Sequence, residues 1–425
     1  MKNLKLYHHQ KKHIRKFLDK KKILNFSQVG TGKTLVAIKS IDFLSLPALI
    51  LCPAYLRKNW EREINKFSCC QQGAYVIESK EDLEGALHSK IVVSSYSQLD
   101  FLDEIFSQKR ILIVDEAHYL KNLKSRRARF FHSYIKKYEP SYCMLMTGTP
   151  VRKHIPDIFS LLAAINPLDF LKVHNNYYSF SHHFTNARVQ KIGSFQTTVF
   201  EGFRNEEELG RYLRHCTVGA TIDDVGELPP YIEKIVRLPR AISEESETEL
   251  WELFCSYREG ERTCDHIATA KSFSALSKAP RTAELVADLI ESGESVVVFS
   301  DHLESSHLLF KKLEKLGAKL ITGATPLVDR DTYITSFQAG EVPALVGTVR
   351  AMGTGVTLTK ARICVFNDLP WDLSDLLQAE ARIYRVSQKR RCLKIICEGG
   401  VVDSRINRIL RKKRVVSDGI DQIFS

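Results

Sequence analysis

Residues 23–34 read Ile-Leu-Asn-Phe-Ser-Gln-Val-Gly-Thr-Gly-Lys-Thr, an apolar tetrapeptide followed by a loop with two glycines. The apolar run Ile23–Phe26 is typical of a strand buried on both faces, and a helical pattern follows over Leu35–Leu44. A strand, a glycine loop and a helix in this order form the context that a phosphate-binding loop requires. The sequence therefore predicts an α/β nucleotide-binding fold around this loop.

The loop residues Gly30, Thr31, Gly32, Lys33 and Thr34 are the predicted ATP-binding residues. The glycines let backbone amides turn toward phosphate oxygens, and the lysine would reach the β- and γ-phosphates. The hydroxyl of Thr34 would bind Mg²⁺. The strict pattern has glycine where this chain has Ser27, and a Gly-Lys-Thr also occurs in ordinary loops, so a second signal is needed.

That second signal is Asp115-Glu116-Ala117-His118, which follows the apolar run Ile111–Val114. An aspartate at the end of a buried strand, 115 − 33 = 82 residues after the lysine, is placed to hold Mg²⁺. The adjacent Glu116 is the predicted acceptor of a proton from the attacking water. The alternative interpretation is a helix that begins with acidic residues, and the presence of the phosphate-binding loop upstream makes that interpretation less favoured.

Apolar runs rich in Val and Ile recur in the first and last thirds of the chain, with helical segments between them. This rhythm is typical of parallel α/β sheets, and it predicts two such blocks. From Asn166 to Pro239 the rhythm is absent, Leu228-Pro229-Pro230 indicates a connector, and Ser243–Asp265 begins as an acidic helical pattern. The predicted strands are Ile23–Phe26, Ala48–Cys52, Tyr75–Ile77, Ile91–Val93, Ile111–Val114, Cys143–Met146, Val296–Phe299, Leu320–Ile321, Ala344–Val346, Ile363–Phe366 and Leu393–Ile396.

Composition restricts the class of protein. The net charge is +12 (62 Lys and Arg against 50 Asp and Glu), with basic runs at Lys2–Lys22 and Arg405–Arg414 that favour a polyanionic partner. No apolar run is long enough for a membrane helix or a signal peptide, so we expect a soluble protein, cytoplasmic or nuclear, without a membrane partner. The ten cysteines lack zinc or disulfide spacing and are predicted to be reduced thiols.

Two further stretches would have a function only where another part of the protein or the nucleotide lies against them. Thr147-Gly148-Thr149-Pro150 ends an apolar run and is a candidate sensor of the nucleotide state, although a plain turn also explains it. Gln378–Arg385 places Arg382 and Arg385 at i and i+3, which predicts that both lie on one face of a helix. Such arginines would stabilise the charge that develops during phosphoryl transfer.

Together these stretches resemble the Swi/Snf-type branch of the superfamily-two helicase-like ATPases, from Gln10 to Arg385. The extension Tyr119–Ser125 is the most family-specific part, because generic helicases lack it. Two segments, Thr357–Thr359 and Cys52–Phe67, are similar to the annealing or fork-remodelling branch. The segments that resemble family motifs are, in order, Leu6–Gln10 (Q motif), Cys52–Ala54 and Asn59–Glu63 (Ia), Ser94–Tyr96 (Ib), Asp115–Ser125, Val298–Ser300 (IV), Gly347–Thr359 (V) and Gln378–Arg385 (VI).

The resemblance implies two RecA-like lobes, residues 1–165 and 270–415. A helical insertion and connector would occupy 166–269, and a short tail 416–425 would follow. ATP and Mg²⁺ would bind where the lobes meet, with Gln10 recognising adenine and Gly355 of motif V also contacting the nucleotide. Catalytic residues would be Lys33, Asp115 and Glu116 from one lobe and Gln378, Arg382 and Arg385 from the other, with Thr34 and Asp115 as the metal ligands.

The implied function is an ATP-dependent translocase on double-stranded DNA that contacts backbone phosphates, and we expect a monomer. An RNA or single-strand helicase remains an alternative. A DNA-binding module gated by ATP and serving a partner protein is another. The histidines at 8, 9 and 13 and at 182–183 have no acid or thiol at ligand spacing, which favours surface or packing roles over metal binding.

Overall fold

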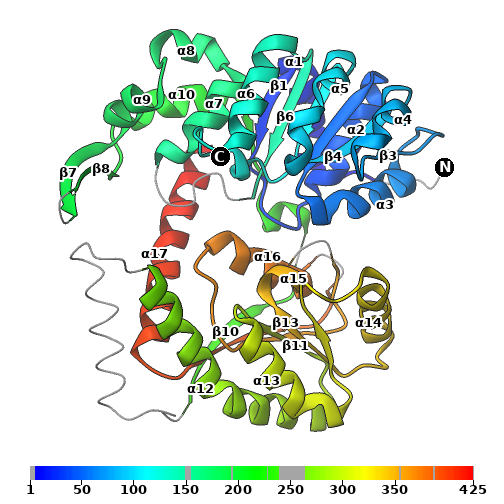
Figure 1. Ribbon diagram of the computed structural model, residues 1–425, viewed down its shortest axis with the longest axis vertical. Coiled ribbons are helices and arrows are strands. Elements are labelled where there is room, and N and C mark those ends of the chain that lie inside the picture. Colours follow the sequence, from blue (N-terminus) through cyan, green and yellow to red (C-terminus); the bar gives the residue numbers. More distant parts are fainter. Residues whose placement is uncertain are drawn as a thin grey trace. The chain divides into compact units, whose positions relative to one another are not determined.

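The computed structural model describes residues 5–148, 155–192, 195–226, 228–238, 264–353, 356–385 and 388–424. The chain divides into two compact units, each with its own parallel sheet (Figure 1). The first unit comprises residues 1–188, 198–226 and 416–425, and the second comprises 189–197 and 227–415. The predicted α/β fold with two parallel sheets is confirmed. The boundaries at 165 and 269 stay a prediction.

The sheet of the first unit has seven parallel strands in the order β3-β4-β2-β5-β6-β1-β9. Helices α1, α2 and α3 contribute to the core on one face of this sheet, and α5, α6 and α7 to the core on the other. The strands are β1 (Lys22–Asn25), β2 (Ala48–Cys52), β3 (Tyr75–Val76), β4 (Ile91–Ser95), β5 (Ile111–Val114), β6 (Tyr142–Met146) and β9 (Thr217–Val218). The helices are α1 (His8–Lys20), α2 (Lys33–Leu44), α3 (Arg57–Phe67), α4 (Leu83–Leu87), α5 (Asp103–Gln108), α6 (Arg126–Tyr138) and α7 (Phe159–Ile165).

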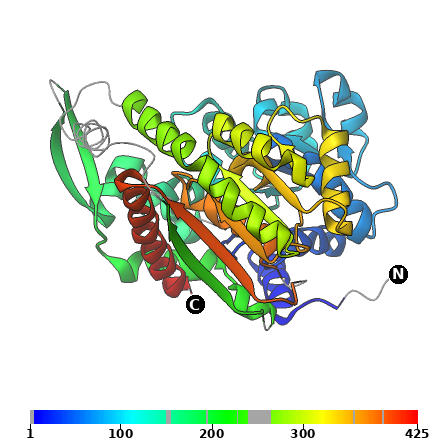
Figure 2. The same ribbon diagram turned by 90° about the horizontal axis from the view of Figure 1, so that it is seen from below.

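The sheet of the second unit has six parallel strands in the order β10-β15-β14-β11-β13-β12. Figure 2 shows the edge strand β10 in green beside β15 in orange-red. The strands are β10 (Tyr231–Arg237), β11 (Val296–Ser300), β12 (Lys319–Ile321), β13 (Ala344–Thr348), β14 (Ile363–Phe366) and β15 (Cys392–Glu398). The helices are α12 (Cys264–Glu291), α13 (Leu303–Leu313), α14 (Leu327–Ala339), α15 (Val349–Met352), α16 (Leu373–Ile383) and α17 (Val401–Phe424).

The continuous apolar runs form central strands because both faces of each sheet are covered. In β2, Leu49 and Leu51 join the core on one face, while Ala48, Ile50 and Cys52 join the core on the other. Strand β11 divides its residues between two cores in the same way. Every apolar run predicted as a strand is a strand, with ends that differ by at most two residues.

The segment between the two blocks, expected as a helical insertion and connector without a comparable rhythm of strands, contains helices and also short or exposed strands. It holds α8 (Phe170–Val173), α9 (Tyr177–Phe184), the hairpin β7 (Asn186–Ile192) and β8 (Phe195–Glu201), and α10 (Glu206–Cys216), followed by β9 and β10. Strand β9 has two residues, and β10 is an edge strand with exposed Glu233 and Lys234, so neither has a continuous buried run. Of the predicted helical stretch Ser243–Asp265, all but the last two residues lie outside the described residues.

Among the described residues, no helix combines the length and the apolar character that crossing a bilayer requires.

Candidate active site

The phosphate loop connects β1 to α2, and its two glycines have backbone conformations that favour glycine. Gly30 has φ 91° and Gly32 has φ 84°, both in the left-handed region. A Cβ atom on Gly32 would also lie 2.4 Å from Nε2 of Gln10. The loop therefore depends on glycine for its backbone angles and for its close packing against α1.

The side chain of Lys33 lies within the loop itself. Its Nζ donates hydrogen bonds to the carbonyl oxygens of Ser27 and Gln28, at 2.6 and 3.0 Å. The segment after β6 lies against the same loop, because a Cβ on Gly148 would be 2.9 Å from Cγ2 of Val29 and 3.5 Å from Nζ of Lys33. This contact is consistent with a sensing role for residues 147–150, although Thr149 and Pro150 lie outside the described residues.

Gln10 lies on α1, buried against the loop. Its Oε1 accepts a hydrogen bond from the backbone N–H of Tyr7 at 3.0 Å, and its Nε2 donates to the carbonyl oxygen of Thr31 at 3.4 Å. The ring of His9 also contacts that carbonyl, at 3.0 Å from Nε2. The structure thus brings Gln10 to the predicted ATP site, and its recognition of adenine stays a prediction.

A segment that sequence reasoning missed also supports the loop. The backbone N–H of Gln28 donates to the carbonyl of Ala220 at 2.8 Å, and the N–H of Ile222 donates to Oε1 of Gln28 at 3.2 Å. One residue before the loop, the N–H of Phe26 donates to the carbonyl of Val218 at 2.8 Å. No local motif indicates this pairing, because the two segments lie about 190 residues apart.

Asp115 follows β5 at the carboxyl end of the same sheet, and its half-buried carboxylate is held by hydrogen bonds. Oδ2 accepts a hydrogen bond from Nε1 of Trp60 at 3.0 Å, and Oδ1 accepts one from the backbone N–H of Glu116 at 2.9 Å. The hydroxyl of Tyr96 donates to the backbone carbonyl of Asp115. Burial, together with the charge of Glu116, raises the pKa of Asp115 to about 7, and the charge of Lys33 acts in the opposite direction.

Glu116 occupies the left-handed region, with φ 50° and ψ 47°. This is an uncommon conformation for a residue with a side chain, and such conformations gather at functional sites. Oε2 of Glu116 lies 3.2 Å from Nδ1 of His118, and the same nitrogen lies 3.0 Å from Oγ1 of Thr147. His118 therefore connects Glu116, the predicted catalytic base, to the segment after β6.

The predicted arginine residues belong to the second unit, and one expectation about them is wrong. Helix α16 ends at Ile383, so Arg385 does not share a helical face with Arg382. Both side chains instead contact one segment of motif V: Nη1 of Arg382 donates to the carbonyl of Val356 at 3.1 Å, and Nη1 of Arg385 donates to Oγ1 of Thr357 at 2.8 Å.

Two further residues of this unit are predicted to belong to the site, Gln378 and Gly355. Gln378 is buried, and its carbonyl accepts a hydrogen bond from Nε of Arg382 at 2.9 Å. Gly355 lies outside the described residues.

The donor atoms at the carboxyl end of the first sheet fit a magnesium ion. Thr34 offers a hydroxyl and Asp115 a carboxylate, and oxygen ligands of this kind are those that Mg²⁺ prefers. A glycine loop that opens a helix, with an Asp-Glu pair at the end of a strand in the same sheet, defines a P-loop nucleotide hydrolase.

Comparison with protein families places the chain within that class. The SNF2-related domain matches residues 3–259, and the helicase conserved C-terminal domain matches residues 278–387. The chain belongs to the SNF2-related domain family and is an ATP-hydrolysing enzyme. The resemblance noted from the motifs is thereby confirmed.

Curated relatives extend this similarity. The chain is 26% identical over 413 residues to the DNA annealing helicase and endonuclease ZRANB3 of Bos taurus, covering 92% of this chain and 38% of the relative. It is 26% identical over 387 residues to the SWI/SNF-related matrix-associated actin-dependent regulator of chromatin subfamily A-like protein 1 of Xenopus tropicalis, covering 86% and 39%. The chain thus spans about two fifths of the length of these relatives.

A solved structure supports the fold. The crystal structure of the DUF1998 helicase MrfA bound to DNA matches with a TM-score of 0.60 at 14% identity, over 96% of this chain and 48% of that one.

Proposed function

We propose that the protein is an ATP-dependent translocase on double-stranded DNA, which moves along or remodels DNA or DNA–protein complexes. The observation that carries the proposal is that one chain of the SNF2-related family holds both sets of predicted catalytic residues. The first set is the phosphate loop with its acid pair, and the second is the arginine pair anchored on motif V. The name of one relative, the DNA annealing helicase and endonuclease ZRANB3, supports DNA as the substrate.

In this proposal the chain's own side chains divide the work of hydrolysis. Lys33 leaves its loop carbonyls to bind the β- and γ-phosphates, and Glu116 accepts the proton of the attacking water. Thr34 and Asp115 would hold Mg²⁺, which neutralises phosphate charge when bound. Arg382 and Arg385 would stabilise the charge of the transition state, as arginine fingers do.

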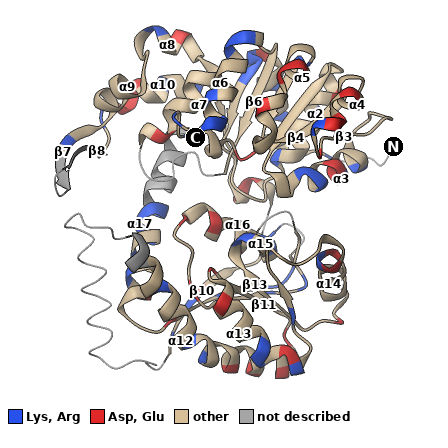
Figure 3. Ribbon diagram, viewed as in Figure 1, with Lys and Arg blue, Asp and Glu red and all other residues tan. Residues whose placement is uncertain are grey.

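DNA would be held through its phosphates, without reading of the bases. Exposed Lys11, Lys12 and Arg15 on α1 are candidates for such contacts. Lys and Arg also recur along α17 (Figure 3), but Arg411 and Arg414 there form ion pairs with Glu233 and Glu380. The α17 run is therefore partly neutralised within its own unit, and α1 is the better candidate.

The first experiment compares ATP turnover in the presence of duplex DNA, single-stranded DNA and RNA. The proposal predicts the strongest stimulation by duplex DNA, whereas a single-strand or RNA helicase would prefer one of the other two. A binding module gated by ATP would show tight DNA binding with little stimulated turnover.

The second experiment compares displacement of a triplex-forming third strand with unwinding of a long tailed duplex under the same ATP conditions. A duplex translocase displaces the third strand and leaves the duplex paired, and Glu116→Gln, which we expect to be inactive in hydrolysis, provides the control. Efficient unwinding without triplex displacement would contradict the proposal and favour the helicase alternative.

A further inference from the structure

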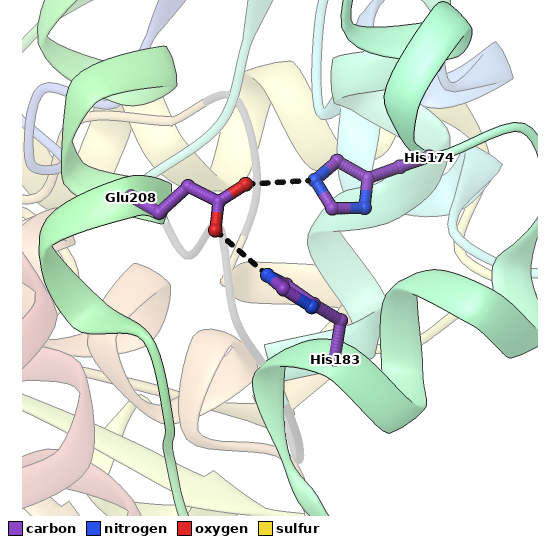
Figure 4. Close-up of side chains that lie close together, drawn as sticks. All are labelled: His174, His183 and Glu208. Carbon is purple, nitrogen blue, oxygen red and sulfur yellow. Dashed lines mark hydrogen bonds and ion pairs between the residues drawn. The ribbon is translucent and has the colours of Figure 1, made fainter.

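Two histidines and a glutamate converge in the first unit, away from the ATP site. His174 directly follows α8, His183 lies on α9, and Glu208 lies in the first turn of α10. Nε2 of His174 is 3.3 Å from Oε1 of Glu208, and Nε2 of His183 is 2.7 Å from Oε2 (Figure 4). The three ligand atoms all lie within 4.8 Å of one another. The spacing of these residues along the sequence does not indicate the cluster.

The rings are held in place by their surroundings. The side chain of His174 is only 3% exposed, and it packs among the aromatic rings of Phe170, Phe184 and Tyr212, with centroids 5.0 to 5.8 Å away. The backbone carbonyl of His183 accepts a hydrogen bond from Nδ2 of Asn205 at 2.8 Å. Glu208 is 29% and His183 40% exposed, so an ion in solution has access to the cluster.

We propose that His174, His183 and Glu208 form a Zn²⁺ site. Two imidazole nitrogens and one carboxylate are a ligand set that zinc accepts, with a fourth position left for water. Zinc–ligand distances of about 2.0–2.2 Å in a tetrahedron place neighbouring ligand atoms about 3.3–3.6 Å apart. In the structure the two imidazole nitrogens contact different carboxylate oxygens, at 3.3 and 2.7 Å, and the three ligand atoms lie within 4.8 Å of one another. To bind zinc, the partly exposed side chains of His183 and Glu208 would therefore rotate so that one carboxylate oxygen and both nitrogens face the ion.

The ion would replace the two N–H protons that the rings otherwise donate to Glu208. It would tie α8, α9 and α10 together, and α9 and α10 flank the hairpin β7–β8. The expected effect is therefore on the stability of this three-helix region. It is independent of the proposed translocation, so the two proposals fail separately.

The test uses the full chain without a histidine tag, stripped with a chelator and titrated with ZnCl₂ by calorimetry. His183→Ala and Glu208→Gln each remove one ligand atom at a partly exposed position, and His182→Ala, one residue along α9, is the matched control. We expect each ligand variant to lose one zinc equivalent or to bind it at least about 100-fold more weakly, since even outer-shell changes cost about 10–100-fold. His182→Ala should bind zinc as the wild type does.

Two other readouts separate a metal site from a plain hydrogen-bonded cluster. Zinc should raise the Tm of the wild type and of His182→Ala, and leave that of His183→Ala unchanged. Co²⁺ should give the visible absorption of a four-coordinate site in the wild type and lose it in Glu208→Gln. Absence of zinc binding by the wild type, or equal stoichiometry and Tm increase in His183→Ala, would overturn the proposal.

Discussion

Asp115 and Glu116 are adjacent in the chain yet occupy different environments. Asp115 is half-buried, and both of its carboxylate oxygens accept hydrogen bonds. Glu116 has left-handed backbone angles and lies beside His118. Neighbouring acids in unlike surroundings commonly take different roles in catalysis, which supports the division into a metal ligand and a proton acceptor.

Glu116→Gln should bind ATP and fail to hydrolyse it. The amide keeps the size of the side chain but cannot accept a proton, and Asp115 is unchanged. Loss of a general base costs about 10²–10⁴-fold in rate, so we expect a drop of at least about 100-fold in kcat. Turnover assays and equilibrium binding of a fluorescent ATP analogue measure the two effects separately. Wild-type turnover by this variant would show that Glu116 is not the base.

Trp60→Phe should weaken the use of magnesium. The indole N–H is one of two donors that fix the Asp115 carboxylate, and phenylalanine keeps an aromatic ring without that donor. We expect turnover to fall about 10-fold, with a higher Mg²⁺ concentration needed for half-maximal rate, as for other groups that orient a ligand. Tyr134→Phe removes a different buried hydrogen bond, to the carbonyl of Leu99, and serves as the control. An unchanged Mg²⁺ requirement would contradict the positioning role.

For single residues, the sequence indicates those that belong to a motif but not the distant residues that hydrogen-bond to them. Lys33 and Asp115 are found from the pattern around them, because a loop and a strand end are local features. Trp60 reaches Asp115 across 55 residues, and Gln28 meets Ile222 across 194. Such contacts depend on the finished sheet, and no short pattern records them.

Among the secondary-structure elements, α16 and the residues after it show how much depends on where a helix ends. Arg382 is buried within α16, while Arg385 lies beyond the last turn and is half-buried. Their shared contact is the segment Val356–Thr357. The spacing of three residues suggested a common helical face, but the backbone at Tyr384 is extended, which changes the direction of Arg385.

Substitution of the two arginines should separate catalysis from stability. Arg385→Ala should lower kcat by about 10³–10⁵-fold, as loss of an arginine finger does, with little change in Tm. Arg382→Ala should lower kcat and also the Tm, because it removes a buried side chain and leaves the partly buried carbonyl of Val356 without this donor. Arg408→Ala, an exposed change on α17, is the control. Unchanged kcat in both variants would exclude the finger role.

Helix α1 is joined to the segment before η7 (Ile222–Val225) through His13, and this contact should make the first unit sensitive to acid. Nε2 of His13 lies 3.0 Å from the carbonyl oxygen of Gly219. Burial lowers the pKa of His13 to about 4, although the hydrogen bond to Gly219 acts in the opposite direction, and the charges of His9 and Lys12 lower this pKa further. Between about pH 6.5 and about pH 4, protons bind this histidine in the unfolded chain but not in the folded one. The free energy of unfolding therefore decreases as the pH is lowered through this window.

We expect this histidine to remove about 2 kcal/mol of unfolding free energy between about pH 7.5 and about pH 5. His13→Gln does not titrate, and it should lose correspondingly less stability over the same interval. Urea midpoints at the two pH values measure the difference. His132, whose pKa burial also lowers to about 4, remains in both proteins as a common background. Equal pH dependence in the two proteins would contradict the assignment.

The element pattern was predictable where burial is uniform along a strand. Strands such as β2 and β5 are covered on both faces and appear as unbroken apolar runs. Strand β10 lies at an edge and mixes Ile with Glu and Lys, and β9 has only two residues, so neither gives that signal. The three residues of the proposed zinc site do not stand out as a set in the sequence for a related reason, since they come from the residue after α8, from α9 and from α10.

For the whole molecule, the proposal requires ATP turnover and DNA binding to be separable properties. Lys33→Ala removes the ammonium group that would bind the phosphates and leaves the surface of α1 unchanged. We expect ATP turnover to be lost while DNA binding stays near the wild-type level. Binding should weaken with salt along a line of slope about −0.9 per phosphate contacted, equal in variant and wild type. Robust hydrolysis by Lys33→Ala would remove the phosphate-loop assignment.

The pairing of β9 with β1 has a consequence for how the protein is made. The ribosome synthesises Gln28 long before Ile222, which supports it from 194 residues further along the chain. At about 5–20 residues per second, the early part of the nascent chain waits roughly 10–40 s for that support. The hydrogen bonds that support the phosphate loop are thus completed only after Ile222 has emerged from the ribosome, so we expect the loop to reach its final conformation late during translation.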